Sequence, residues 1–430
     1  MTMKTLIIQV LAWILKKLAQ LTIWRFRPGV IGITGSVGKT SAKMAIATVL
    51  RGERKVRWSK GNLNNELGLP LTILGEWSEE ELKLVSRGEA AGKKLIPKLA
   101  FWIRVICFSA WQAAFGKQAD YPEILILEYG ADKPGDIKKL LSVVRPNVGV
   151  ITAIGEVPVH VEFYAGPEEV AKEKGRLIEC LPAASFAVLN GDEVRVANLA
   201  DRSRAHVMTF GFDKDVDVRV SNMENRADNA RPLGMSFKLE YGGNVVPVRI
   251  DGVFGKAHAY AAAVAASVGI IFGMNLVRIA EALRDYIPVH GRMELLPGVK
   301  YTYILNDCYN ASPLSMRAAL DTLKFLPAKR KIAVLGDMLE IGKYAIEEHE
   351  KLGRVVTGIA DILITVGPRG KFIAEGAKKA GMNKRHIQSF DLAGEAQAPV
   401  QALIKKGDLI LIKASRAMHL EDVVEEIRAF

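Results

Sequence analysis

The 430 residues of this chain are too many for one small core and predict two or three domains, at roughly 150 residues each. Their composition, 49% hydrophobic and 25% charged, excludes a disordered or fibrous chain, and three widely spaced cysteines exclude a disulfide framework and favour a reducing cytoplasm. The net charge of +12 is compatible with an anionic membrane or acidic small molecules, but no basic motif with interleaved aromatic residues is present, so we expect no nucleic-acid partner.

The first apolar segment covers residues 4–26 and predicts a helix. Five aliphatic residues recur in it at helical spacing: Ile7, Leu11, Ile14, Leu18 and Leu21. No small-residue cleavage site follows, which argues against a signal peptide. The paired Lys16 and Lys17 disfavour a simple membrane span and favour a helix lying flat on an anionic membrane, with Trp13 and Trp24 at the interface. A helix packed on the protein body is the alternative.

Residues 32–41, Gly-Ile-Thr-Gly-Ser-Val-Gly-Lys-Thr-Ser, predict a phosphate-binding loop and therefore ATP. An apolar run at 30–33 predicts a buried strand, and residues 41–50 predict the following helix, whose N-terminus attracts phosphate. In such a loop Lys39 reaches the β- and γ-phosphates and the Thr40 hydroxyl ligates Mg²⁺. Ile33 stands where the strict pattern has its first glycine, so an ordinary glycine turn is the alternative. The expected nucleotide contacts are Gly35, Ser36, Gly38, Lys39, Thr40 and Ser41.

A second apolar segment covers residues 95–115 and carries only Lys98 and Arg104 as charges. Its aromatic residues are Phe101, Trp102, Phe108 and Trp111. The segment is long enough to span a bilayer, but no return segment precedes the strand expected at 124–127. We therefore expect an interfacial or partly inserted helix, with burial against the first helix as the alternative.

The rest of the chain alternates short β-branched runs with helical stretches, which is typical of a parallel sheet covered by helices. Strands are expected at 124–127 and 148–153, shorter strands between 186 and 250, an alanine-rich helix at 260–271, and, after Pro288, strands at 332–335, 362–366 and 409–412. The predicted fold class is α/β, with a P-loop central domain built on a mostly parallel sheet and a smaller C-terminal Rossmann-like α/β domain. The expected domains are an apolar helix at 1–28, an ATP-binding domain at 29–287 with an apolar insertion at about 78–120, and a C-terminal domain at 288–430.

Two polar residues follow the strands that are predicted to lie beside the phosphate-binding loop. Glu128 comes directly after the strand at 124–127, where open parallel sheets bind ligands, and can help to hold Mg²⁺. His160 lies in the loop after the next strand. A solvated glutamate and a structural histidine are the alternatives, and Lys172, Lys174 and Arg176 alone indicate only a basic helix face.

Five further segments give these residues a context. They are Gly-Asn-Leu-Asn-Asn-Glu-Leu-Gly-Leu-Pro (61–70), Leu-Glu-Tyr-Gly-Ala-Asp-Lys-Pro-Gly-Asp-Ile (127–137), Asn-Asp-Cys-Tyr-Asn-Ala-Ser-Pro (306–313), Val-Leu-Gly-Asp-Met-Leu-Glu-Ile-Gly (334–342) and Lys-Ala-Ser-Arg (413–416). Together with the P-loop, and in this order, they resemble the Mur ligase family over residues 29–430.

The resemblance implies an ATP-dependent amide ligase of peptidoglycan precursor synthesis that activates a carboxylate as an acyl phosphate. The implied partners are a muramoyl-peptide precursor and D-alanyl-D-alanine, and the cofactors are ATP and Mg²⁺. By the same resemblance Lys39, Glu128, His160 and Lys174 are catalytic; Thr40 and Glu128 hold one Mg²⁺, and His160 a second. Lys174 aligns with a lysine that the family carries as a carbamate and that also binds the second metal, with Lys172 two residues away as the other register.

The resemblance also implies two further groups of contacts. Residues implied to face the nucleotide are Arg292, Asp307, Tyr309 and Asn310. Residues implied to face the substrates are Asn62, Asn64, Asn65, Asp337, Ser415 and Arg416. Turns and helix caps are the alternative role for these polar side chains.

Three departures from the family pattern stand out. About thirty residues precede the P-loop, fewer than the family's UDP-gripping domain needs; His258 and Ala261 stand where asparagines approach adenine; and residues 75–121 are expanded. These departures indicate a substrate presented at the inner face of the membrane or by a partner protein, with peripheral membrane contact. The alternatives are a ligase for another amine and carboxylate, or a non-catalytic membrane-recruited ATP-binding scaffold, against which the intact metal-site residues argue.

Overall fold

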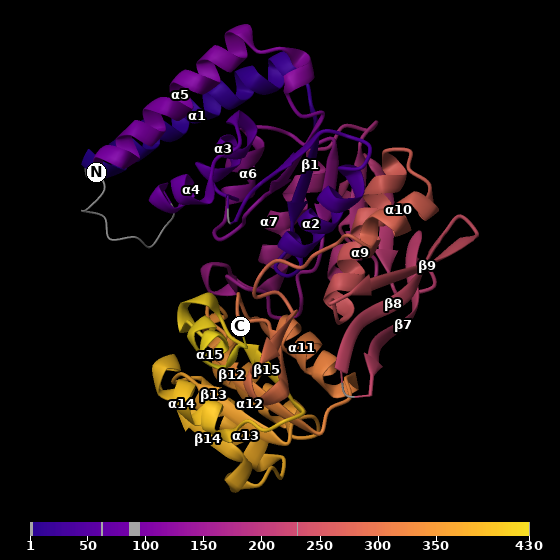
Figure 1. The fold of residues 1–430 in the computed structure, drawn as a ribbon. Helices are drawn as coiled ribbons and strands as arrows, with labels where there is room; N and C mark the ends of the chain where they lie inside the picture. Colours follow the sequence, from indigo (N-terminus) through magenta and orange to yellow (C-terminus); the bar gives the residue numbers. More distant parts are fainter. Residues whose placement is uncertain (1–2, 62, 86–94, 230, 430) are drawn as a thin grey trace.

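The computed structural model describes residues 3–61, 63–85, 95–229 and 231–429. The chain forms two β-sheets, each with helices on both faces, and the two parts lie one above the other in Figure 1. The larger sheet belongs to the N-terminal part and the smaller sheet to the C-terminal part. This arrangement confirms the predicted α/β fold class.

Nine strands of the described residues form the larger sheet, in the order β2-β3-β1-β4-β5-β6-β7-β8-β9. Neighbours are parallel from β2 to β7 and antiparallel from β7 to β9, so the sheet is mostly parallel, as predicted. The strands are β1 (Gly29–Thr34), β2 (Val56–Trp58), β3 (Ile124–Glu128), β4 (Val148–Ile151), β5 (Phe186–Asn190), β6 (His206–Gly211), β7 (Val218–Asp228), β8 (Arg231–Tyr241) and β9 (Asn244–Asp251).

Strand β1 is apolar on both faces. Ile31 and Ile33 join the apolar cluster under α2 (Lys39–Leu50) and α9 (Lys256–Ile271), whereas Val30 joins the cluster on the opposite face. A parallel strand inside a sheet is covered on both sides, so an unbroken apolar run is expected at this position. The strand ends at the P-loop, which therefore lies at the carboxyl edge of the sheet.

Helix α9 is rich in alanine, and almost every residue from His258 to Gly269 is buried. It packs against α2 and against strands β6 and β7. Alanine side chains are short enough to let the helix approach these elements closely. The helix predicted at 260–271 is thus confirmed, and it begins four residues earlier.

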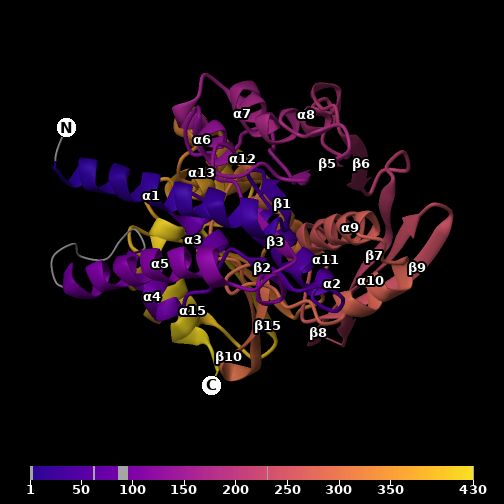
Figure 2. The same ribbon diagram turned by 90° about the horizontal axis from the view of Figure 1, so that it is seen from above.

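Helices α1 (Met3–Phe26) and α5 (Leu95–Phe115) lie side by side along the outer edge of the N-terminal part (Figures 1 and 2). One face of α1 packs on α3 (Gly68–Leu74) and α5 through Leu15, Ala19 and Phe26. Both predicted helices are confirmed, and packing on the protein body holds for this inner face. Among the described residues, the helix Thr5–Phe26 alone is long and apolar enough to cross a membrane, by length and composition.

The smaller sheet has the order β10-β11-β15-β12-β13-β14, with β10 antiparallel and the other neighbours parallel. The three strands predicted for this part fall within β12, β15 and β13. The strands are β10 (Glu294–Gly298), β11 (Thr302–Asn306), β12 (Arg330–Gly336), β13 (Ile362–Val366), β14 (Ile387–Phe390) and β15 (Asp408–Lys413).

The remaining helices pack on the two sheets or on other helices. The α-helices are α4 (Glu79–Val85), α6 (Asp136–Leu141), α7 (Pro167–Glu179), α8 (Val194–Ala197), α10 (Leu276–Leu283), α11 (Pro313–Phe325), α12 (Ala345–Val356), α13 (Gly370–Lys379), α14 (Ala393–Leu403) and α15 (Glu421–Ile427). The 3₁₀ helices are η1 (Gln118–Asp120), η2 (Val161–Phe163), η3 (Ala200–Arg202), η4 (Val299–Tyr301), η5 (Gly342–Tyr344), η6 (Lys384–His386) and η7 (Arg416–Met418).

A single apolar cluster crosses from one part to the other. It contains Ile154 and Phe254 of the N-terminal part and Met293, Met316 and Leu335 of the C-terminal part. The carboxyl edge of the larger sheet therefore faces side chains of the C-terminal part. Because this apolar packing is continuous between the two parts, it does not mark where one domain ends. The domain boundaries predicted after residues 28 and 287 therefore stay predictions.

Candidate active site

The P-loop turn is fixed against the end of β4. Gly35 and Gly38 have φ angles of 147° and 89°, and a Cβ at Gly35 would lie 2.1 Å from Thr152 Oγ1. The N–H groups of Ser36 and Val37 donate to the carbonyl oxygen of Ala153 at 2.6 and 3.1 Å. Since α2 begins directly after this turn, its N-terminus points at the loop, which is the arrangement that binds phosphate.

Lys39 is the first residue of α2. Its ammonium donates to the carbonyl oxygen of Gly35 at 2.6 Å. Burial lowers the pKa of Lys39; the charge of Glu128 opposes this shift and the charge of Arg292 adds to it. The carboxylate of Glu128 and the guanidinium of Arg292, from separate parts of the chain, therefore both lie within electrostatic reach of the P-loop lysine.

Glu128 is buried and is the last residue of β3, which extends one residue beyond the strand predicted at 124–127. The ammonium of Lys43, on the second turn of α2, contacts Glu128 Oε1 at 2.7 Å, and both side chains are only 2% exposed. An unpaired carboxylate would be very unfavourable at such a position, so the lysine stabilises it as an ion. Glu128 is thus an anionic group held beside the P-loop.

His160 lies in the loop after β4, with a left-handed backbone (φ 67°). Its Nε2 is 3.4 Å from Asp132 Oδ1, and its Nδ1 is 3.2 Å from Glu340 Oε2, which belongs to the C-terminal part. Burial lowers the pKa of His160 to about 4, with the charge of Asp132 opposing the shift. The imidazole is therefore neutral at neutral pH and has a lone pair available.

Lys174 lies on the buried face of α7 and forms no hydrogen bond or ion pair with any described residue. Burial, together with the charge of Lys39, lowers the pKa of Lys174 to about 7. A substantial fraction of its amine is therefore neutral and nucleophilic at neutral pH. Lys172 is about half exposed and pairs with Glu169, so its side chain points away from this region.

The four side chains that the sequence singled out as catalytic converge. The charges of Lys39 and Lys174 both lower the pKa of His160, and Lys39 also acts on Lys174 and feels Glu128. Such effects require short separations, since solvent screens charges over longer ones. Among the described residues, however, no three His, Cys, Asp or Glu side chains form a group that could hold a metal by themselves.

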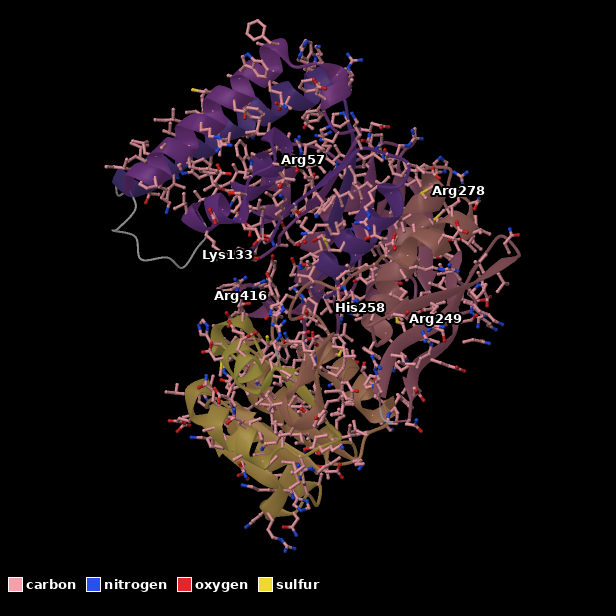
Figure 3. All side chains as sticks on the ribbon, in the orientation of Figure 1. Arg57, Lys133, Arg249, His258, Arg278 and Arg416 are labelled. Atoms are coloured by element: carbon pink, nitrogen blue, oxygen red, sulfur yellow. The ribbon has the colours of Figure 1, made fainter. Side chains whose placement is uncertain are left out.

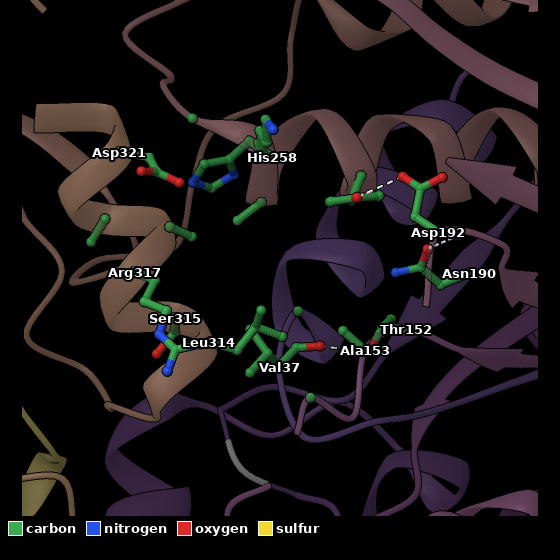
Figure 4. A pocket seen from close by; sticks show the side chains of 18 of the residues that line it. Val37, Thr152, Ala153, Asn190, Asp192, His258, Leu314, Ser315, Arg317 and Asp321 are labelled. Carbon is green, nitrogen blue, oxygen red and sulfur yellow. Dashed lines mark hydrogen bonds between the residues drawn. The ribbon is translucent and has the colours of Figure 1, made fainter. Parts of the chain in front are cut away.

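A cavity of about 1480 Å³ adjoins the P-loop between the two parts of the chain (Figure 4). It reaches the P-loop at Val37, Gly38 and Ser41, and α11 forms its opposite wall. None of Lys39, Glu128, His160 and Lys174 lines it. The cavity therefore lies on one side of the phosphate loop and the four catalytic candidates on the other.

The inner wall of the cavity joins aromatic rings to polar groups. Tyr260 donates to Asp192 Oδ2 at 2.6 Å, and Asn190 lies next to Asp192 (Figure 4). Phe210 and Phe212 pack edge-on against the Tyr260 ring. Flat rings beside hydrogen-bonding groups are the surroundings that a nucleoside needs.

His258 also faces this cavity and lies in the region where the two parts of the chain meet (Figure 3). Its Nδ1 lies 2.8 Å from the Tyr286 hydroxyl and its Nε2 lies 3.0 Å from the Arg292 carbonyl oxygen. Both ring nitrogens are therefore occupied by the protein itself. The imidazole orients the backbone at Arg292 rather than offering a free hydrogen bond.

The C-terminal residues implied to face the nucleotide form one cluster. The Tyr309 ring contacts two guanidinium groups, at 4.1 Å from Arg292 and 5.2 Å from Arg416. Asp307 accepts from the Lys413 ammonium at 2.7 Å and lines the cavity with Arg292. Asn310 supplies its carbonyl oxygen to the same lysine at 2.8 Å. Tyr309 and Asn310 support the cluster without lining the cavity.

Asp337 and Ser415 hold a loop of the C-terminal part. Asp337 is buried and accepts from the Gly370 N–H at 2.7 Å, and the Ser415 hydroxyl accepts from the Leu339 N–H at 2.9 Å. Glu340 follows Leu339 directly in this loop and contacts His160. These two polar residues therefore position a group that reaches the N-terminal part.

The asparagines implied to face the substrate differ in their surroundings. The Asn65 side chain accepts from the N–H groups of Leu67 and Gly68, so it caps the start of α3. The Asn64 carbonyl oxygen accepts from Gly130, two residues after Glu128, at 2.9 Å. Asn62 lies outside the described residues.

Comparison with known proteins adds independent information. The Mur ligase middle domain matches residues 111–269, and the Mur ligase, glutamate ligase domain matches residues 291–416. The UDP-N-acetylmuramoyl-tripeptide–D-alanyl-D-alanine ligase of Bacillus subtilis (strain 168) is 30% identical over 415 residues, which cover 96% of this chain and 79% of that protein. The chain belongs to the Mur ligase family.

Solved structures agree with this assignment to the Mur ligases. MurF ligase from Thermotoga maritima, in complex with ADP, superposes with a TM-score of 0.77 at 25% identity, covering 96% of this chain and 83% of that chain. Folylpolyglutamate synthase of Mycobacterium tuberculosis, with ADP and AMPPCP, gives 0.63 at 17% identity and 96% of both chains, which shows a shared fold.

Sequence analysis of this Mur ligase missed several residues of the site. Lys43 was not singled out, although a lysine four residues after Lys39, among alanines and isoleucines of a buried helix face, is a signal that could have been read. Asp132 and Glu340 lie inside segments already noted, but their contacts with His160 depend on the fold. Asp192 carried no sequence signal beyond a position after a strand.

Proposed function

We propose that this Mur ligase uses ATP to join D-alanyl-D-alanine to the carboxylate of a muramoyl-peptide, through an acyl phosphate. The observation that carries the proposal is the convergence of Lys39, Glu128, His160 and Lys174 beside the P-loop. The printed name of the Bacillus subtilis relative supports the choice of substrates. The proposed location of the reaction is the cytoplasm.

ATP binding has support from two directions. The Thermotoga maritima relative was solved with ADP, and the cavity beside the P-loop offers aromatic and polar groups to a nucleoside. In the proposed arrangement Gly35, Ser36, Gly38 and Ser41 contact the phosphates, and Asp307 and Arg292 face the ribose and phosphates. Tyr309 and Asn310 position Arg292 and Lys413.

The residues near Lys39 fit Mg²⁺ by their chemistry. The Thr40 hydroxyl and the Glu128 carboxylate are oxygen ligands of the kind that Mg²⁺ prefers, and the neutral His160 imidazole offers a nitrogen. Glu128 already accommodates a cationic group, the Lys43 ammonium. Since no group of three His, Cys, Asp or Glu side chains exists among the described residues, a Mg²⁺ held here would need further ligands from phosphate or water. When bound, Mg²⁺ neutralises charge on the phosphates.

In the proposed first step, a carboxylate oxygen attacks the γ-phosphorus, and the bond to the departing ADP breaks. Two anions meet in this step, so the Lys39 ammonium stabilises the charge that develops on the transferred group. In the second step, the amine nitrogen attacks the acyl carbon and inorganic phosphate leaves. Arg416, on the exposed side of Tyr309, is proposed to face the peptide, with Asn64 on the opposite side.

Lys174 is proposed to act as a carbamate. Its neutral amine attacks the carbon of CO₂, a C–N bond forms while one C=O π bond breaks, and a proton leaves the nitrogen to solvent, so that the neutral amine becomes an anionic carbamate. The low pKa of about 7 favours this reaction, because an ordinary lysine is almost wholly protonated at neutral pH. The resulting carboxylate would add a further oxygen ligand to those of Thr40 and Glu128.

The test is ADP release by the full chain with UDP-muramoyl-tripeptide, D-alanyl-D-alanine and Mg²⁺. Release that requires both substrates supports the proposal. Release with another amine and carboxylate, but not with this pair, points to a ligase of different specificity. Binding of ATP without release under any combination points to a scaffold. Either of the last two results overturns the proposed reaction.

Matched variants sharpen this test. Lys174→Ala should slow turnover while keeping ATP binding, and Lys172→Ala, two residues away and half exposed, should leave turnover unchanged. Lys39→Ala should lose both ATP binding and turnover. Equal turnover of the wild type and Lys174→Ala would contradict the carbamate role.

A further inference from the structure

The side of α1 and α5 that faces away from the protein body is strongly apolar. Trp13, Trp24, Trp111 and Phe115 are among its exposed residues, with Trp24 69% and Phe115 72% exposed. The other exposed large apolar residues on this side of the two helices are Leu6, Ile7, Val10, Leu21, Ile96, Leu99 and Ile103. We call these eleven residues the outer face.

The outer face follows from helical geometry. In α1 the residues at 10, 13, 17, 21 and 24 are all exposed and recur every three or four positions, on the side opposite to the buried Leu15, Ala19 and Phe26. In α5 the exposed Ile96, Leu99 and Ile103 follow the same spacing. Each helix thus has one apolar stripe inside the protein and a second stripe outside it, which burial in the core does not explain.

The two outer stripes form one surface. The helices lie side by side, and in the view from above no other described helix or strand covers them (Figure 2). With about 1.5 Å of rise per residue, α1 and α5 are about 36 and 31 Å long, so the pair presents a broad flat layer. An exposed apolar surface of this extent marks an interaction site.

The charges of the two helices have one sign. Helix α1 contains Lys4, Lys16, Lys17 and Arg25 and no Asp or Glu, and α5 contains Lys98 and Arg104 and no Asp or Glu. Lys17 lies within the exposed stripe of α1, and Arg27 follows this helix as another exposed cation. Arg104 pairs with Glu81 of α4, so the positive charge open to anionic lipid headgroups comes from α1 and Arg27, beside the apolar residues and tryptophans.

Contacts along α1 favour a helix lying in the membrane plane over one crossing it. Lys16 donates to the Ser142 hydroxyl at 2.7 Å and Gln20 to the Ser142 carbonyl oxygen at 2.8 Å. The Phe26 ring stacks on Tyr121 at 4.4 Å. A spanning α1 would have to leave these contacts and its place in the apolar cluster with Leu15 and Ala19.

We propose that the outer face of α1 and α5 docks on an anionic lipid bilayer, holding the Mur ligase at the membrane surface with both helices parallel to the plane. Trp13, Trp24, Trp111 and Phe115 enter the headgroup boundary, and Lys17, Arg25 and Arg27 contact anionic headgroups. This contact needs neither ATP nor substrate, so membrane binding can be tested independently of the proposed ligase reaction.

The test is flotation of the full chain with unilamellar vesicles, one set of equimolar phosphatidylglycerol and phosphatidylethanolamine and one of phosphatidylcholine alone. The wild type is expected to float with the anionic set, less with the neutral set, and less at about 1 M salt, where screening is within about 3 Å. A triple variant, Trp13→Ser with Ile103→Ser and Trp111→Ser, should bind at least about tenfold more weakly, because binding scales with the apolar area inserted.

The matched control carries the same number of apolar-to-serine changes at exposed positions far from the outer face: Val277→Ser, Ile346→Ser and Leu392→Ser. It should bind vesicles like the wild type. Lys17→Glu should weaken binding to the anionic set only. All variants should keep the unfolding midpoint of the wild type, since the altered side chains are exposed.

Four results would overturn the proposal. The wild type floats with neither vesicle set; the triple variant floats as well as the control; sedimentation velocity shows a wild-type dimer that the triple variant breaks, which makes a second copy the occupant; or the bound protein resists alkaline carbonate, which makes α1 a membrane span.

Discussion

The buried pair of Lys43 and Glu128 gives the sharpest prediction for stability. In Lys43→Met the Glu128 carboxylate keeps its buried place but loses its counter-ion, 2.7 Å away. Breaking a buried pair from one side typically costs about 3–5 kcal/mol, because the remaining charge is uncompensated. Lys43→Met should therefore lower the free energy of unfolding far more than loss of an exposed ion pair does.

Urea unfolding at pH 7 measures this loss. The double variant Lys43→Met with Glu128→Gln removes the charge as well as its partner and should recover most of the stability. Lys172→Met, which breaks the half-exposed pair with Glu169, should cost at most about 1 kcal/mol. A loss in Lys43→Met below about 1 kcal/mol would refute the reasoning.

Three further predictions concern the site. With ¹³CO₂ the wild type should show a carbamate signal in ¹³C NMR that grows from pH 6 to 8, as the Lys174 amine with its pKa of about 7 loses its proton; the signal should vanish in Lys174→Ala and persist in Lys172→Ala. The His160 ring should titrate in NMR near pH 4, so that activity between pH 6 and 8 owes nothing to its ionisation; a midpoint above 6 would contradict this. Gly35→Ala should cost at least about 1–3 kcal/mol and abolish ATP binding, because its Cβ would meet Thr152 at a positive φ, whereas Gly52→Ala, facing open space, should do neither.

Sequence patterns predicted most of the fold because its signals are local. A few consecutive residues are enough to recognise the apolar run of β1, the alanine-rich α9 and the three predicted strands of the C-terminal sheet. The antiparallel strands β7 to β9 were less distinct, since their alternation is broken by register shifts between Ser221 and Glu224 and between Arg226 and Ala227. The position of the outer face could be read only once the inner face of α1 was known.

The site was predictable where a residue follows a strand or a glycine-rich turn, and not where the fold supplies the partner. Lys39 and Glu128 are of the first kind. Glu340 is of the second, because its contact with His160 joins positions 180 residues apart in the sequence. The burial that lowers the pKa of Lys174 and leaves Lys172 exposed also depends on which face of α7 packs inward, and the basic run in the sequence did not settle that.

Positive charge is concentrated where the two parts of the molecule meet. Arg292 lowers the pKa of Lys39 and of Lys413, and Lys39 in turn lowers that of Lys174, so four cations from both parts act on one another. Mutual repulsion of this kind opposes the packing that brings the P-loop and the C-terminal sheet together. A polyphosphate lying between them reverses the sign of that term, because each cation then faces an anion. Nucleotide binding is therefore expected to strengthen the packing of the two parts, which already share one apolar cluster around Phe254 and Met293.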